Sequence, residues 1–144
     1  LLQEAYNAEI ETVMNYLANS VHLDGIHAGP IKSSLEDDIE EELEHAQKLA
    51  KRIKVLGGVV PGSQAMKWNQ TTLQPPETTI DVMHVIQGVI DAEEDAIERY
   101  QKLVELTDGV DFPTQDLCID LMMDEQEHRR EFIGYKLDYE KHLK

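Results

Sequence analysis

Cysteine is almost absent from this sequence of 144 residues, which contains only Cys118. One thiol cannot form an intrachain disulfide, and it cannot supply the thiolate cluster that structural zinc or iron–sulfur centres need. Because free thiols are typical of reducing compartments, we expect a cytoplasmic protein. Cys118 itself is expected to be a small core residue of the last helix.

Long hydrophobic runs and basic residues are also scarce. No apolar run approaches the roughly 20 residues that a membrane-spanning helix needs. The 13 lysines and arginines face 29 aspartates and glutamates, which gives a formal net charge of −16. Such a surface repels phosphate backbones and attracts cations. We therefore expect neither a nucleic-acid partner nor a membrane partner.

The remaining composition, 41% hydrophobic and 29% charged, is typical of globular proteins. The length fits one domain, so residues 1–144 are expected to form a single unit. Apolar residues recur at helical spacing over residues 1–22, 31–56, 78–107 and 114–142, and no segment alternates convincingly with period two. The sequence thus predicts an all-α, antiparallel four-helix bundle.

A long connection separates the second and third predicted helices. Residues 59–77 contain Pro61, Pro75 and Pro76, and they are too many for a tight turn. This segment can cross from one end of the bundle to the other, with one or two helical turns near residues 63–68. Trp68 is expected to be a packing residue.

Two Glu-x-x-His motifs lie deep inside predicted helices, at Glu42 to His45 and at Glu125 to His128. Residues i and i+3 share one face of a helix, so each motif projects a carboxylate and an imidazole in the same direction. A single motif of this kind is common on protein surfaces. Two of them within apolar stripes indicate a shared buried site.

Each half of the chain repeats the same pattern of site residues. Glu9 precedes Tyr16 by seven positions, and Glu93 precedes Tyr100 by seven. Glu42 lies 33 positions after Glu9, and Glu125 lies 32 positions after Glu93. Two helical hairpins packed about a pseudo-twofold axis would bring four carboxylates and two imidazoles together. These predicted ligands are Glu9, Glu42, His45, Glu93, Glu125 and His128.

Charge indicates what such a cluster would hold. Burying an ionised carboxylate costs several kcal/mol, while a whole domain is stable by only about 5–15 kcal/mol. Two divalent cations would offset four carboxylates, and oxygen-rich ligation with one nitrogen per metal suits iron or manganese. Tyr16 and Tyr100 can orient a carboxylate of the opposite half, although plain aromatic packing is the alternative. Asp38 could guide ions inward. The remaining glutamates of that helix are expected to point mostly toward solvent, namely Glu36, Glu40, Glu41 and Glu44.

These residues resemble the ferritin-like superfamily, specifically bacterioferritins and the Dps-like ferritins with a bacterioferritin type of di-iron site. The resemblance rests on Ala8-Glu9, Asn15-Tyr16, Glu41-Glu42-Leu43-Glu44-His45-Ala46 and Asp124-Glu125-Gln126-Glu127-His128. It implies two iron ions per subunit, with manganese or zinc as substitutes. By this similarity Glu42 and Glu125 bridge the irons, Glu9 and His45 complete one iron, and Glu93 and His128 complete the other. Glu94 is adjacent, but the match to Glu9 favours Glu93.

Two departures from bacterioferritin refine the resemblance. Leu43 stands where bacterioferritin has its haem-ligating methionine, so no haem is expected by that route. Only 16 residues of the sequence follow His128, so no fifth helix is expected, and the crossover is long enough for a small helix instead. These last two features are similar to the Dps-like group, which implies a homo-oligomer, expected to be a dodecameric shell.

The resemblance implies a ferroxidase that oxidises Fe(II) with dioxygen or hydrogen peroxide and stores the ferric product. Two alternatives stay open. One is a rubrerythrin-like di-iron peroxidase without mineral storage, although that family often carries a Cys-x-x-Cys domain that is missing from this sequence. The other is a metal-free interaction bundle whose glutamates face outward.

Overall fold

The computed structural model describes residues 1–142, which form four long helices and one turn of 3-10 helix. The elements are α1 (Leu2–His22), α2 (Gly29–Val55), η1 (Ser63–Ala65), α3 (Val82–Thr107) and α4 (Phe112–His142). The described residues contain no strand, so the predicted all-α bundle is confirmed. None of these helices has both the length and the hydropathy that a membrane crossing needs.

The start of α3 differs most from the prediction. The helix begins at Val82 because the Asp81 carboxylate accepts a hydrogen bond from the backbone N–H of His84, at 3.1 Å, and caps it there. The preceding residues belong to the connection, so the predicted start at residue 78 is four residues early.

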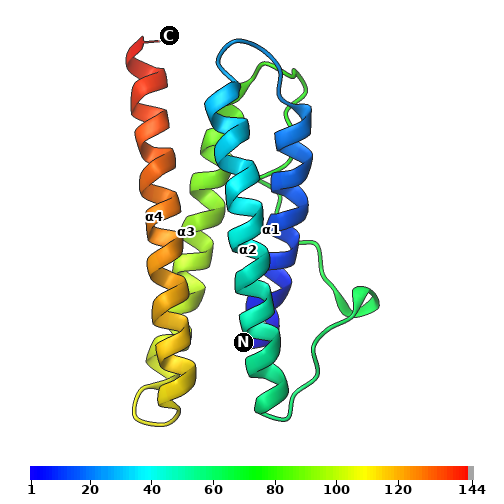
Figure 1. The fold of residues 1–144 in the computed structure, drawn as a ribbon, viewed down its shortest axis with the longest axis vertical. Coiled ribbons are helices and arrows are strands. Elements are labelled where there is room, and N and C mark those ends of the chain that lie inside the picture. Colours follow the sequence, from blue (N-terminus) through cyan, green and yellow to red (C-terminus); the bar gives the residue numbers. More distant parts are fainter. Residues whose placement is uncertain (143–144) are drawn as a thin grey trace.

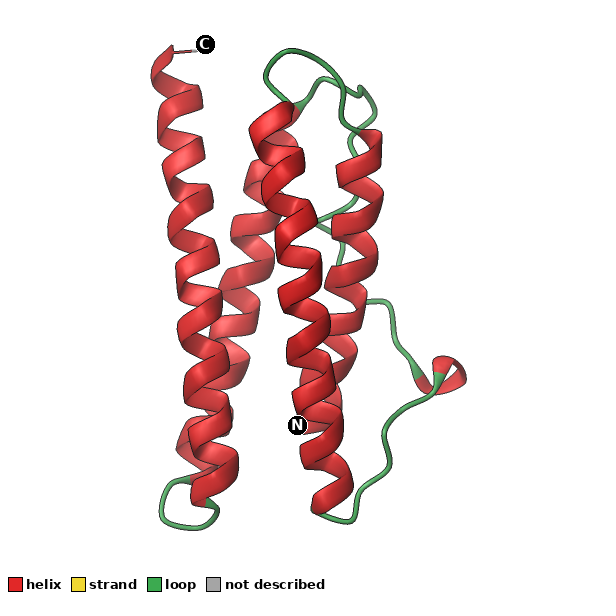
Figure 2. Ribbon diagram, viewed as in Figure 1, coloured by secondary structure: helices red, strands yellow, loops and turns green. Residues whose placement is uncertain are grey.

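The helices are arranged as two antiparallel hairpins, α1 with α2 and α3 with α4 (Figure 1). Contacts within each hairpin are dense, and contacts between the hairpins run mainly from α1 to α3 and, more sparsely, from α2 to α4. The segment from Leu56 to Asp81 returns the chain along the bundle, mostly as loop (Figure 2). The predicted long crossover is therefore present, and α2 and α3 run in the same direction.

Hydrogen bonds fasten this crossover to α1. The Asn7 side chain donates to the Lys67 carbonyl at 2.6 Å and accepts from the Lys67 N–H at 2.8 Å. The buried Glu11 carboxylate accepts from the N–H groups of Asn69 and Gln70 at 2.9 and 2.7 Å. Trp68, which lies between Lys67 and Asn69 in the sequence, is 56% exposed, so the prediction that it is a packing residue is wrong. Its neighbours, rather than its ring, hold the segment in place.

The crossover also approaches α3 closely at one glycine. A Cβ atom built on Gly88 would lie 2.7 Å from the Thr72 carbonyl oxygen and 3.3 Å from the Leu73 Cα. Leu73 is buried against this part of the core. Only a residue without a side chain lets the two backbones approach in this way.

The core consists of two apolar clusters at different heights along the bundle. One contains Leu35 of α2 and Phe132 of α4, and the other contains Leu49 of α2 and Leu121 of α4. Cys118 is fully buried in the second cluster, as predicted. On both helices the Glu-x-x-His motif lies between the two clusters, which leaves a band of buried polar groups in the middle of the bundle.

Candidate metal centre

The six predicted ligands meet in this polar band, one or two from each helix. Each is at most 5% exposed, whereas Glu94 is exposed and points away. The i to i+3 spacing of the two motifs places each imidazole beside the carboxylate of its own helix. The structure thus brings together Glu9 of α1, Glu42 and His45 of α2, Glu93 of α3, and Glu125 and His128 of α4.

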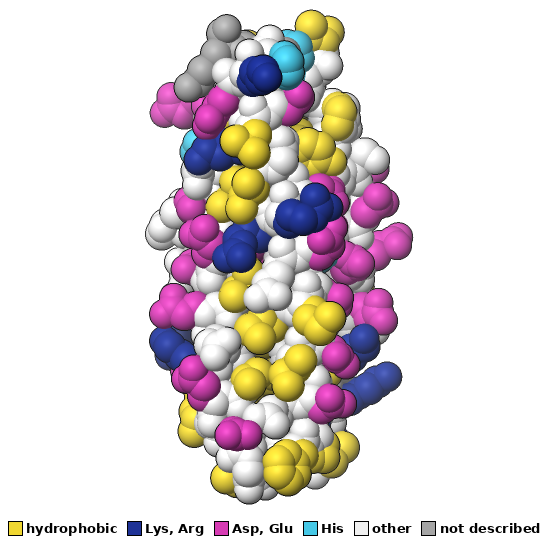
Figure 3. Space-filling view, turned by 90° about the vertical axis from the view of Figure 1, so that its left-hand side faces the viewer, with side chains coloured by type: hydrophobic (Ala, Val, Ile, Leu, Met, Phe, Trp, Pro, Cys, Tyr) yellow, Lys and Arg dark blue, Asp and Glu magenta, His cyan; other side chains and the backbone are white. Residues whose placement is uncertain are grey.

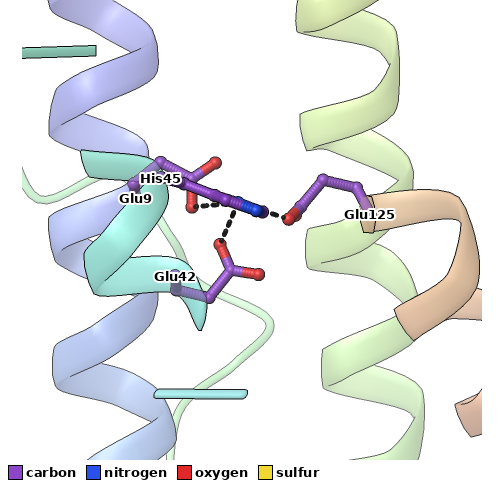
Figure 4. A group of neighbouring side chains, drawn as sticks. All are labelled: Glu9, Glu42, His45 and Glu125. Carbon is purple, nitrogen blue, oxygen red and sulfur yellow. Dashed lines mark ion pairs between the residues drawn. The ribbon is translucent and has the colours of Figure 1, made fainter. Parts of the chain in front are cut away.

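The six side chains form two overlapping groups, each able to surround one cation. In each group the candidate ligand atoms lie within 4.8 Å of one another, and Glu42 and Glu125 belong to both. Figure 4 shows the group completed by Glu9 and His45, whose side chains converge from α1, α2 and α4. Glu93 and His128 complete the other group.

Both imidazoles turn their Nδ1 atoms toward the carboxylates. His45 Nδ1 lies 3.0 Å from a Glu125 oxygen and 3.6 Å from a Glu42 oxygen (Figure 4). His128 Nδ1 lies 3.1 Å from the other Glu42 oxygen and 3.8 Å from a Glu93 oxygen. The two rings are nearly parallel, with centroids 6.4 Å apart. Each Nδ1 is therefore aimed at its own group of oxygens.

Several buried atoms of the cluster have no hydrogen-bond partner. Buried polar atoms in proteins are nearly always hydrogen-bonded, so unpartnered ones need an explanation. Divalent cations explain them, since carboxylate oxygens and a neutral imidazole nitrogen are ligands that iron, manganese and zinc accept. The unpartnered carboxylate oxygens are Glu9 Oε2, Glu42 Oε2 and Glu93 Oε2, while His45 Nδ1 and Glu125 Oε1 face only each other, at 3.0 Å.

Two tyrosines hold carboxylates of the opposite hairpin. Tyr16 donates to Glu93 Oε1 and Tyr100 donates to Glu9 Oε1, both at 2.5 Å. Burial and the adjacent carboxylates, Glu93 for Tyr16 and Glu9 for Tyr100, raise the pKa of each phenol well above its usual value. Both phenols therefore stay protonated donors, and each leaves the second oxygen of its carboxylate free for a cation.

The outer nitrogens of the imidazoles contact acids that the sequence reasoning missed. His45 Nε2 lies 3.0 Å from Asp124 Oδ2, and His128 Nε2 contacts Glu41 Oε2. Both acids are 52% exposed, so Glu41 faces solvent as expected and in addition contacts His128. The repeat contains a signal for both contacts, because each acid directly precedes one of the two shared glutamates.

In the absence of a cation, protons offset part of the charge of the cluster. Burial, together with repulsion from neighbouring carboxylates, raises the pKa of Glu42 and Glu125 well above their usual value. Burial alone would lower the pKa values of the imidazoles, but hydrogen bonding and attraction to carboxylates outweigh it. The pKa of His45 rises to about 11 beside Glu125 and Glu9, and that of His128 rises to about 11 beside Glu93.

An acidic pocket of about 270 Å³ opens beside His128. Asp38, 5% exposed, lies at this pocket with one oxygen 3.5 Å from His128 Nε2. Burial raises the pKa of Asp38 to about 7. The pocket reaches His128 from the surface and is lined mostly by carboxylates, which attract cations. Its lining consists of Ser34, Asp37, Asp38, Glu41, Asp124, Glu127, His128 and Glu131.

Comparison with known proteins identifies the family of this chain. A family model described as a ferritin-like domain matches residues 1–138. A DNA protection during starvation protein from Pyrococcus furiosus is 29% identical over 136 residues, which cover 92% of this chain and 72% of that protein.

Two solved structures share the fold. The bacterioferritin-related protein from Bacteroides fragilis, described as a dodecameric thioferritin, is 27% identical with a TM-score of 0.87, covering 99% of this chain and 88% of that one. A ferritin-like, diiron-carboxylate protein from Bacillus anthracis is 24% identical with a TM-score of 0.81, covering 93% and 91% of the two chains. At that identity the second likeness supports the fold alone.

Proposed function

We propose that this chain, which belongs to the ferritin-like domain family, is a ferroxidase that oxidises Fe(II) at two adjacent cation positions inside the bundle. The observation that carries the proposal is the set of buried carboxylates and imidazoles that face one another in two groups sharing Glu42 and Glu125, with three carboxylate oxygens left unpartnered. A core made only for stability would pair or replace such groups.

The residues divide the work of binding two Fe(II) ions. Glu9 and His45 serve one ion and Glu93 and His128 serve the other, while Glu42 and Glu125 bridge both. Four carboxylates offset the four positive charges of two Fe(II) ions, and the neutral imidazoles add nitrogen ligands without charge. Tyr16 and Tyr100 orient the terminal carboxylates by donating to one oxygen of each.

Two neighbouring ions suit a two-electron oxidant. Each pair of Fe(II) ions gives up two electrons as it becomes Fe(III), and these reduce dioxygen to hydrogen peroxide, or hydrogen peroxide to two waters, with two protons taken up. The buried band keeps the ions close together while the acidic pocket beside His128 admits Fe(II) from solvent. The ferric product would then leave for storage outside the bundle.

Storage requires an assembled shell, and we propose a homo-oligomer. Hydrophobic side chains are spread along the face that lies on the left in Figure 1, among acidic and basic ones (Figure 3). The exposed hydrophobic side chains of α4 include Phe112, Met123 and Leu137, each more than 60% exposed. Exposed apolar side chains in such number favour contact with further subunits. The dodecameric relative makes a twelve-subunit shell the form to test.

Anaerobic titration with Fe(II), followed by mixing with dioxygen or hydrogen peroxide, tests the proposal. The native chain should bind two Fe(II) per subunit and oxidise them faster than Fe(II) in buffer. Glu42→Gln with Glu125→Gln should lose both ions together, because both positions use these residues. Glu44→Gln, whose side chain is 62% exposed, is the matched control and should behave as the native chain.

Two results would overturn parts of the proposal. Binding of fewer than two Fe(II) per subunit, or native oxidation rates in the double variant, would exclude the ferroxidase site. Peroxide consumption by a small oligomer without accumulation of ferric product would replace storage with the peroxidase alternative. Light scattering and electron microscopy of the same samples separate these two outcomes.

A further inference from the structure

The internal repeat is broken at one position beside the metal centre. Aligning Glu42 with Glu125 pairs Glu41 with Asp124, so an acid precedes the shared glutamate in both halves. Four residues before the shared glutamate, the first half has Asp38 and the second half has Leu121. The two halves of the site therefore differ by one carboxylate.

The structure places this extra carboxylate on one imidazole only. Asp38 is 5% exposed, with Oδ1 at 3.5 Å from His128 Nε2 and with Oδ2 buried and unpartnered. Its counterpart Leu121 is 1% exposed and packs in the second apolar cluster. His45 Nε2 contacts the half-exposed Asp124 but no equivalent buried acid within the described residues.

We infer that Asp38 makes the two cation positions unequal, so that the position at His128 binds a divalent cation more tightly than the position at His45. Asp38 is a positioning residue, because it acts through His128. Glu41 is the acceptor at Nε2, which fixes the tautomer that leaves Nδ1 free as a ligand. Asp38, at 3.5 Å from the same nitrogen, adds a second carboxylate beside the ring. A nearby cation favours the ionised form of Asp38. The buried negative charge then attracts the cation more strongly than an exposed charge, which solvent would screen.

This inference rests on the proposed pair of cation positions but not on oxidation. A competing reading follows from the same residues, since Asp38, Glu41 and His128 Nε2 could surround a third cation. The two readings exclude each other. A neutral imidazole has one free ring nitrogen, so His128 cannot give Nε2 to a third cation while Nδ1 binds another.

Calorimetric titration of the chelator-treated full chain with Zn(II), at one fixed pH, tests the inference. The native chain should bind two Zn(II) in unequal steps. Asp38→Asn should weaken the tighter step by roughly 10- to 100-fold, the range found for partners of ligating histidines, and leave the weaker step unchanged. Asp124→Asn is the control at the other imidazole. It should lower the weaker of the two Zn(II) affinities instead, and so increase the ratio between the two affinities.

A double-mutant cycle separates positioning from a structural effect. In a His128→Ala background, Asp38→Asn should no longer change the affinity of the remaining step, because its effect passes through the imidazole. The inference would be overturned if Asp38→Asn still weakened Zn(II) binding in the His128→Ala background. It would also be overturned if Asp38→Asn alone left both Zn(II) affinities at their native values. Loss of a third bound equivalent in Asp38→Asn would overturn it in favour of the third-cation reading. A native chain that binds no Zn(II) pair would instead count against the proposed function.

Discussion

Loading the cluster with two divalent cations is expected to release protons. Before loading, the imidazoles of His45 and His128 are protonated, because their neighbouring carboxylates raise both pKa values to about 11. A ring nitrogen must lose its proton before it can bind a cation. Glu42 and Glu125 can contribute further protons, since burial and like charge raise their pKa values as well. Two to four protons should therefore leave for each pair of cations that binds.

The count sets how strongly binding depends on pH. Each displaced proton changes the binding free energy by about 1.4 kcal/mol per pH unit. Two to four protons correspond to about 3–5 kcal/mol per pH unit for the pair of cations, or roughly 10²- to 10⁴-fold in the product of the two binding constants. Because protons compete with the cations, affinity should fall as the pH falls.

Anaerobic titration with Zn(II) in a weakly buffered solution, with base added to hold the pH, counts the protons directly. His45→Asn should release about one proton fewer, since it removes one imidazolium. Glu44→Gln changes an exposed side chain outside the cluster and should release the native number. Release of fewer than two protons per pair of cations would refute the reasoning, because it would show that the imidazoles are neutral before metal arrives.

Three further predictions test the fold and the cluster. The metal-free protein should lose stability as the pH rises from 6.5 toward 11, because over this range the folded chain keeps protons on His45 and His128 that the unfolded chain has released. Thermal unfolding in the presence of a chelator, at several pH values, measures this loss. A stability that stays flat or rises with pH would contradict the prediction. Gly88→Ala should lower the free energy of unfolding by about 1–3 kcal/mol, because the new Cβ atom would clash with the Thr72 carbonyl. Gly134→Ala has open space around it and should stabilise α4 by up to about 1 kcal/mol. Urea unfolding compares the two variants. Tyr16→Phe should destabilise the metal-free chain by about 1–3 kcal/mol by leaving Glu93 Oε1 unpaired, while Tyr6→Phe, a change at a half-buried tyrosine, should have a smaller effect in the same assay.

The parts of the structure that were predictable from sequence depend on spacing within one helix or on the repeat. Helical periodicity predicts the four helices, and the i to i+3 motifs predict which side chains share a face. The matching positions of Glu9 and Glu93 in the repeat predict in addition which side chains meet from different helices. Two copies of one helical hairpin are expected to present equivalent faces to each other. The same match predicts that Glu93, rather than the adjacent Glu94, points inward, and Glu93 is the buried one.

The contacts that were not predictable depend on the path of the chain between elements. Glu41 and Asp124 lie one residue from the inward stripe, about 100° around the helix, where an acid ordinarily faces water. They reach an imidazole only because the opposite hairpin packs against that edge. Glu11 is 3% exposed for a similar reason, since the crossover lies over it and donates two backbone hydrogen bonds. No periodicity within α1 distinguishes it from a surface glutamate.

Neither hairpin contains a complete cation position. Glu42 and Glu125 come from different hairpins and are shared by both positions, and each tyrosine serves a carboxylate across the interface. Contacts between the hairpins are far sparser than contacts within them. The cluster is therefore one polar connection between the two halves of the bundle, beside the hydrogen bonds of Arg52 to Asp111 and of Ser34 to Glu131. Cations that bind there hold the hairpins together, so metal binding and the packing of the bundle are expected to stabilise each other.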